Sequence, residues 1–143
     1  MRHRNKWWQQ YQDNPDHRQM TNEDIAEACD AAADLLEGHW IQGTWVMTLD
    51  DGKAGYCLEG GLAAALGMNA NLDDDINAKE LLHGCPVYDA VYGTICEMEP
   101  DEWEAIPSWN DLGSREESEV IDLLRTTAKR VLGVGPDQME VTA

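Results

Sequence analysis

The stretch Gly55-Tyr-Cys-Leu-Glu-Gly-Gly-Leu-Ala-Ala-Ala-Leu-Gly67 decides how the rest of the chain is organised. Its leucines recur at helical spacing with small residues between them, so the pattern predicts a helix that begins at Cys57. Gly60 and Gly61 each cost a helix interior about 1 kcal/mol relative to alanine. Their presence indicates close approach by a neighbouring element or by a ligand, and we favour close packing.

A β-hairpin is predicted at about residues 40–57, directly before this helix. Residues 39–49 are rich in aromatic and β-branched side chains, and Asp50-Asp-Gly-Lys53 is a turn signal. The first predicted helix starts after the cap Thr21 and stops at Gly38. Two further helices are predicted at about 77–83 and 87–98. The last one follows a capping box at 114–117 and stops at Gly133. The predicted fold class is therefore α+β, mostly α: a small, single-core helical domain with one hairpin.

We expect three regions: a basic and aromatic N-terminal arm (1–20), one globular domain (21–133) and a C-terminal tail (134–143). A chain of 143 residues is long enough to bury a core without disulfides. No apolar run approaches the roughly 18 residues that a membrane helix needs, and no secretory signal follows the basic start, so we expect no membrane association. Four cysteines with no Cys-x-x-Cys pair are typical of reduced, buried thiols and predict a cytoplasmic location.

Charge is the strongest compositional signal. The chain carries 10 Lys and Arg against 28 Asp and Glu, a formal net charge of −18. Because the arm is basic, the rest of the chain is more acidic still. Such a body repels nucleic-acid phosphate, which argues against direct DNA or RNA binding. An acidic surface instead attracts a basic partner or imitates DNA, and simple solubility is the plainer alternative.

Our main hypothesis is a small acidic interaction protein that binds a protein partner through acidic and tryptophan-rich surfaces. The run 97–104 places five acids around Trp103. It is either a solvated face or a patch presented to a basic partner. The residues that we expect to bind the partner are Trp40, Trp45, Trp103, Trp109, Asp101, Glu102 and Glu104.

The order of several short motifs resembles that of an uncharacterised family, a domain of unknown function. After a first helix come Trp40-Ile-Gln-Gly43 and the Cys-Leu-x-Gly-small-Leu-x-x-Ala pattern of 57–65, then Trp109-Asn-Asp111 and a Glu-Val-Ile-x-Leu-Leu helix at 119–124. That family comprises small proteins of actinobacteria and their phages, and the resemblance covers about residues 22–132. It implies a compact, helix-rich domain in a bacterial host cell, and it implies no activity. A phage factor that binds a basic host protein is then one form of the main hypothesis.

A second hypothesis is a small-molecule-binding domain. Its pocket would be floored by the Gly60-Gly61 helix and walled by Trp40, Trp45 and Trp109. The acidity of the chain argues against anionic ligands such as nucleotides, and no cofactor is predicted.

A third hypothesis is a hydrolase or transferase that uses Cys57, although we favour a protein without enzymatic activity. A thiol at a helix N-terminus has its thiolate stabilised by the helix dipole. His39 could face this thiol across the hairpin as a base, with Asp111 orienting the imidazole. The favoured alternative is a buried, structural cysteine, with Trp109-Asn110-Asp111 as a turn and cap.

A partial match to a calcium-binding loop occurs at residues 69–80. Asp74 stands where such a loop has the glycine of its sharp turn, so we favour an acidic loop that leads into a helix. His83-Gly-Cys85 lacks further ligands at zinc spacing, and we predict no metal site. The weak calcium-like candidates are Asn69, Asn71, Asp73, Asp75 and Glu80.

Overall fold

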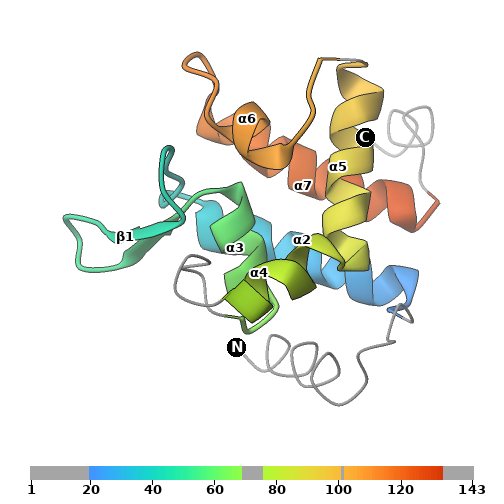
Figure 1. Ribbon diagram of the computed structural model, residues 1–143, viewed down its shortest axis with the longest axis horizontal. Helices are drawn as coiled ribbons and strands as arrows, with labels where there is room; N and C mark the ends of the chain where they lie inside the picture. The colour runs from blue at the N-terminus through green and yellow to red at the C-terminus, as the bar shows by residue number, and fades with distance from the viewer. Residues whose placement is uncertain (1–19, 69–75, 101, 134–143) are drawn as a thin grey trace.

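The computed structural model describes residues 20–68, 76–100 and 102–133. Within these ranges the protein is mostly helical with one two-stranded hairpin, which confirms the predicted α+β class (Figure 1). None of the described helices is long and apolar enough to cross a membrane. The predicted arm (apart from Met20) and the predicted tail lie outside the described residues. The elements in chain order are α2 (Asn22–Leu36), β1 (Val46–Thr48), β2 (Ala54–Tyr56), α3 (Leu58–Ala65), α4 (Ile76–His83), α5 (Pro86–Met98), α6 (Ile106–Asn110) and α7 (Glu117–Val131).

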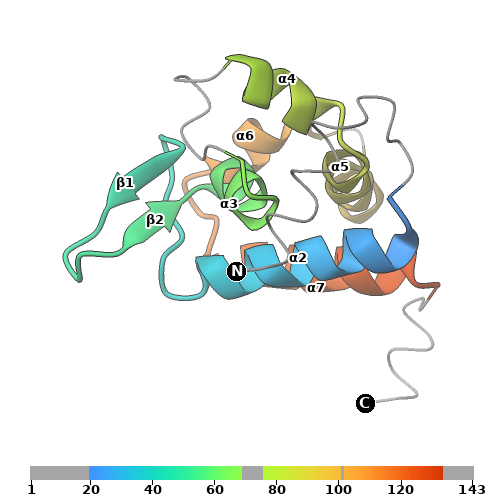
Figure 2. The same cartoon turned by 90° about the horizontal axis from the view of Figure 1, so that it is seen from below.

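The two longest helices, α2 and α7, lie side by side and form the base of the fold (Figure 2). They run antiparallel, because the Glu117 carboxylate at the start of α7 accepts a hydrogen bond from the backbone N–H of Gly38, just beyond the end of α2. In the middle of the pair, Arg125 lies 3.0 Å from the carboxylate of Asp30 and 2.8 Å from that of Asp34. Helices α3 and α5 pack above this base and enclose the core (Figure 2).

Helix α2 begins where the sequence predicts. Thr21 is its N-cap, with the Thr21 hydroxyl accepting from the backbone of Asp24 at 3.0 Å. The side that faces the core consists mainly of alanine, together with Cys29 and Leu36, all buried. Small side chains let the neighbouring helices approach closely, so this surface holds both α7 and α3.

Helix α3 packs against α2 at Gly61. A Cβ added to Gly61 would stand 2.9 Å from Cδ2 of Leu36, closer than side-chain atoms approach one another. All eight residues of α3 are buried. The glycine therefore serves the close packing of two helices, which is the interpretation that the sequence favoured.

The hairpin is shorter than the predicted range 40–57. Val46 pairs with Tyr56 and Thr48 with Ala54 across an antiparallel ladder, and the intervening turn contains Gly52 at φ 81°. On the other edge of β2, Trp40 forms a parallel bridge with Tyr56. Residues 41–45, between Trp40 and β1, lie outside the sheet and include Gly43, whose φ of 85° is one that favours glycine.

Two further helices follow the predicted periodicity. Helix α4 starts one residue before the predicted 77–83. In α5 the predicted stripe Val87, Val91 and Ile95 is buried, and Pro86 occupies its first turn, where a missing N–H costs nothing. Helix α5 meets α7 through Thr127, whose hydroxyl donates to that of Thr94 at 2.8 Å.

The predicted start of α7 is wrong by two residues. The N-cap is Glu116 rather than Ser114, and its backbone N–H donates to the carboxylate of Glu119 at 2.9 Å. The reason lies in Arg115, whose side chain is buried and donates to the backbone oxygen of Trp109 at 3.0 Å. This inward anchor holds residue 115 outside the helix.

Candidate functional site

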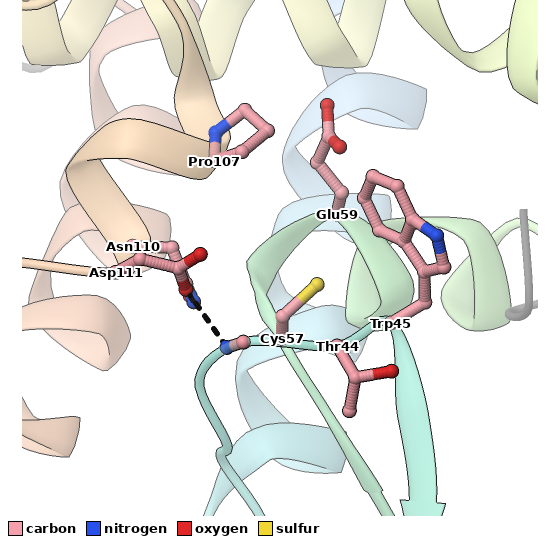
Figure 3. Close-up of a pocket in the computed structure, with 8 residues that line it drawn as sticks. Thr44, Trp45, Cys57, Glu59, Pro107, Asn110 and Asp111 are labelled. Atoms are coloured by element: carbon pink, nitrogen blue, oxygen red, sulfur yellow. Dashed lines mark hydrogen bonds between the residues drawn. The ribbon is translucent and has the colours of Figure 1, made fainter.

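A pocket of about 300 Å³ lies where three elements meet. The loop before β1 forms one wall, the start of α3 forms the floor, and α6 with the residue after it forms the opposite wall (Figure 3). Cys57 and Glu59 are buried, whereas Thr44 and Asp111 are exposed at the mouth. The described residues that line it are Gly43, Thr44, Trp45, Cys57, Glu59, Pro107, Asn110 and Asp111.

Asn110 joins the walls of this pocket. Its side-chain oxygen accepts hydrogen bonds from the indole of Trp40 at 2.8 Å and from the backbone N–H of Leu58 at 2.9 Å. Its amide nitrogen donates to the backbone oxygen of Ile41 at 3.3 Å. Asn110 is 1% exposed and is the last residue of α6, with Asp111 as the C-cap of that helix. The Asn110 side chain also caps α3, which is distant in the chain.

Asp111 fixes the loop at the mouth of the pocket. Its carboxylate accepts from the backbone N–H of Gly43 at 3.0 Å, the dashed bond in Figure 3. Gln42 adds two hydrogen bonds from its side chain to the backbone oxygens of Asn110 and Leu112, at 2.9 and 2.8 Å. These bonds explain why the loop leaves the sheet, and they form the pocket before any ligand arrives.

Glu59 is the most unusual residue of the pocket. Its side chain is 1% exposed. Oxygen Oε2 accepts a hydrogen bond from the Tyr88 hydroxyl at 2.5 Å and lies 3.2 Å from Nε2 of His83. Oxygen Oε1 is buried and has no hydrogen-bond partner within the described part of the chain. Burial, and then the hydrogen bond to Glu59, raise the pKa of Tyr88, so this phenol remains a donor at neutral pH.

Cys57 has the position that the sequence predicts and the chemistry of a structural thiol. It is the N-cap of α3, and its sulfur accepts from the backbone N–H of Gly60 at 3.3 Å. Burial raises the pKa of Cys57 to about 11, which outweighs the hydrogen bond from Gly60. At neutral pH the residue is therefore a protonated thiol, and a thiol is a weak nucleophile.

The hypothetical arrangement of Cys57, His39 and Asp111 is not assembled. His39 Nε2 lies 2.9 Å from the carboxylate of Asp51 in the hairpin turn, and its Nδ1 lies 3.0 Å from the Glu37 backbone oxygen. The Asp51 hydrogen bond is the main cause that raises the pKa of His39. His39 lines a separate depression beside Asp34, Lys53 and Tyr56, so the pocket at Cys57 lacks an imidazole base from this residue.

The expected tryptophan walls are only partly right. Trp45 lines the pocket, but Trp40 packs half-buried against Asn110, and Trp109 lies in the core at 1% exposure. Gly61 faces Leu36 instead of the pocket, and the floor is formed by Cys57 and Glu59.

The residues predicted to bind a partner are scattered over the fold. Trp109 and the half-buried Trp103 both donate their indole N–H to Glu99, at 2.9 and 3.1 Å. Arg115 stacks on the Trp109 ring, with its guanidinium carbon 3.8 Å from the ring centre. Two residues of the predicted acidic run 97–104 therefore belong to this cluster. Trp103 packs against the core, and Glu99 accepts its hydrogen bond. Glu102 and Glu104 are exposed, and Asp101 lies outside the described residues.

The calcium-like candidates are almost all outside the described residues. This applies to Asn69, Asn71, Asp73 and Asp75, whereas Glu80 is exposed on α4. Within the described ranges, no three His, Cys, Asp or Glu side chains are grouped so as to hold a metal ion.

The fold and its pocket define a small α+β domain with a buried carboxylate beside a preformed cavity. The chain belongs to the family of unknown function DUF6197, whose model matches residues 20–130. This match confirms the predicted membership of an uncharacterised family. No curated protein and no solved structure matches the chain.

Proposed function

We propose that the protein is a ligand-binding domain whose site is the pocket between the hairpin, α3 and α6. One observation carries this proposal: Glu59 lines the floor of the pocket, and its Oε1 is buried without a hydrogen-bond partner in the described residues. Leaving such an acceptor unpaired costs about 1–3 kcal/mol. A ligand that donates a hydrogen bond to this oxygen would recover that cost, so the binding of such a ligand is favoured.

The rigidity of the pocket supports the same function. The Asn110 side chain connects α6 to α3, and the Asp111 carboxylate fixes the opposite loop at Gly43. A site held in place by such bonds loses little entropy when a ligand binds. Its volume of about 300 Å³ suits a small molecule or a single long side chain.

Thermal unfolding of the full chain with a panel of small cationic, neutral and anionic metabolites tests this function. A ligand that binds only the folded state raises the unfolding temperature. Thr44→Trp should block the mouth and abolish that rise, whereas Thr48→Trp, on the exposed part of β1, should leave it unchanged. If no compound raises the unfolding temperature, or if Thr44→Trp has no effect on the rise, the pocket is not a ligand site.

A second candidate function is the binding of a basic protein partner by the acidic surface. Each of the three arginines among the described residues forms an ion pair within the protein. Arg115 pairs with Glu119, Arg125 with Asp30 and Asp34, and Arg130 with Glu97. Glu102 and Glu104 are exposed and are not among the partners of these three arginines. A DNA mimic is one form of this candidate, in which the partner is a DNA-binding protein.

Capture of a basic partner from the natural host at two salt concentrations tests the second candidate. Binding should weaken at the higher salt concentration, because surface charges are screened. The double change Glu102→Lys and Glu104→Lys should remove it, while Glu80→Lys on α4 serves as the matched control. Capture that is insensitive to salt and to the double change would contradict this candidate.

The cellular setting is also proposed. Cys29, Cys57, Cys85 and Cys96, all among the described residues, form no disulfide, as expected for a protein of a reducing compartment. We place the protein in the cytoplasm of a bacterial cell, with an actinobacterial or phage origin. The role there is binding rather than catalysis, since the thiol at Cys57 is protonated and lacks His39 as a base.

A further inference from the structure

We propose that the ligand of the pocket carries a positively charged nitrogen, a protonated amine or a guanidinium, and that Glu59 is its counter-ion. The inference rests on the proposed ligand-binding function and names the chemical class of the ligand. It is carried by three features of the pocket: its charge, its free acceptor and its aromatic wall.

The charge of the pocket has one sign. Glu59 lies in the floor and Asp111 at the mouth, and none of the described lining residues is lysine or arginine. Arg115, which precedes α7, is directed instead to Trp109 and Glu119. His83, which lies 3.2 Å from Oε2 of Glu59, carries a positive charge only when it is protonated, and it does not line the pocket. The lining therefore supplies no permanent positive charge to the buried carboxylate, so an incoming cation is favoured over a neutral or anionic ligand.

The hydrogen bonds of Glu59 leave one position for the ligand. Oε2 accepts the hydrogen bond from the Tyr88 hydroxyl and lies near Nε2 of His83. The rings of Tyr88 and His83 are in contact, with their centroids 4.8 Å apart. These two side chains hold the carboxylate in one orientation. Oε1 remains for a donor from the ligand, and an N–H from a cation makes the shorter, stronger kind of hydrogen bond with a carboxylate.

The aromatic wall suits the same class of ligand. Figure 3 shows the Glu59 carboxylate between Pro107 and the indole of Trp45. Tryptophan is the best ring for attracting a cation through its face, and a guanidinium also stacks on it. Because the cavity is small, the cation is either a free small molecule or one lysine or arginine side chain of a basic protein.

Nuclear magnetic resonance titration of the full chain at constant ionic strength tests this inference. The probes are methylguanidinium and butylammonium, with methylurea as the neutral analogue of methylguanidinium. We expect saturable shifts of the Gly43 amide and Trp45 indole signals with both cations and none with methylurea. Cations that cause no saturable shift at these two groups would overturn the inference.

The variant Glu59→Gln separates the charge from the shape of the side chain. It should weaken cation binding by about tenfold or more, since it removes the buried counter-charge. Asp111→Asn at the mouth should weaken binding less, and Glu80→Gln on α4 should leave it unchanged. Dispersed amide signals of each variant establish that it is folded. If Glu59→Gln does not fold, the inference is tested by Asp111→Asn and by methylurea. It is overturned if Asp111→Asn binds the cations as tightly as the wild type does and the wild type binds methylurea as tightly as methylguanidinium.

Further outcomes identify the source of the cation and decide whether the broader proposal of a ligand-binding pocket holds. A capped Gly-Arg-Gly peptide that binds more tightly than methylguanidinium points to a protein side chain, and a weaker one points to a free small cation. If methylurea or an anion binds at these groups and the cations do not, the pocket is a ligand site and only the cationic class is wrong. If nothing in the metabolite panel or among the probes binds, both proposals fail.

Discussion

The side-chain oxygen of Asn110 lies 2.9 Å from the backbone nitrogen of Leu58, although 52 positions separate the two residues in the chain. Leu58 is the first residue of α3, and an N–H at the start of a helix has no partner within that helix. The same oxygen also accepts from the indole of Trp40. One buried amide therefore fixes the start of α3, the segment before the hairpin and the end of α6.

Asn110→Ala should destabilise the protein because it leaves the N–H of Leu58 and the indole N–H of Trp40 without their acceptor. The expected loss is about 1–3 kcal/mol in the free energy of unfolding, measured with urea. Leu112→Ala, at an exposed side chain two residues further on, is the control and should change little. A loss no larger than that of the control would show that Asn110 does not connect these elements.

Gly61→Leu should destabilise the fold, because even a Cβ at this position would stand 2.9 Å from the buried Leu36 side chain. Overpacking of this kind costs about 1–3 kcal/mol. Combining it with Leu36→Ala should recover part of the loss. At Gly93 in α5 an added Cβ meets nothing within 4 Å, so Gly93→Ala should be neutral or slightly stabilising. Equal losses at both glycines would contradict the packing argument.

The thiol of Cys57 should react with iodoacetamide only on unfolding. It is 6% exposed, and burial raises its pKa to about 11, so little thiolate exists at pH 8. Mass spectrometry of tryptic peptides after alkylation, with and without urea, measures this reactivity. Cys57→Ser should be mild, since serine is a good N-cap. Rapid alkylation of the native protein would mean that Cys57 is an activated nucleophile.

Glu99 should make stability depend on acid pH. Hydrogen bonds from Trp103 and then Trp109, with the charge of Arg115, hold its pKa below the usual value of 4.5. The unfolded carboxyl therefore binds a proton at a higher pH than the folded one. Its contribution is complete above pH 4.5 and is lost as the pH falls through the lowered pKa of the folded state.

Urea unfolding between pH 7 and pH 3 measures that dependence. Glu99→Gln should flatten the acid part of the stability curve, whereas Glu104→Gln, at an exposed position, should preserve its slope. Parallel curves for the wild type and Glu99→Gln would show that this cluster does not link protonation to folding.

The helices could be predicted from the sequence because their determinants are local. A few neighbouring residues are enough to recognise the stripe Val87, Val91 and Ile95 and the cap Thr21. The structure confirms both. The start of α7 was misplaced because Arg115 is anchored by a tryptophan of another element.

The pocket was harder to predict because it depends on distant pairs. The sequence places Cys57 and Trp45 near a candidate site, but it assigns no role to Glu59 in a helix of small residues. Its burial depends on Tyr88 and His83, which follow 29 and 24 positions later. A lone carboxylate in an otherwise apolar, glycine-containing helix was the available signal. The role of Asn110 likewise needs the fold to bring it to Leu58.

A crystal structure of the full chain with methylguanidinium tests the central claim most directly. The account predicts that the cation occupies the pocket, with a nitrogen about 3 Å from Oε1 of Glu59 and its plane against Trp45. It also predicts unchanged hydrogen bonds from Tyr88 to Glu59 and from Gly43 to Asp111. A structure in which the cation is absent from the pocket, or in which a protein group occupies Oε1, would contradict it.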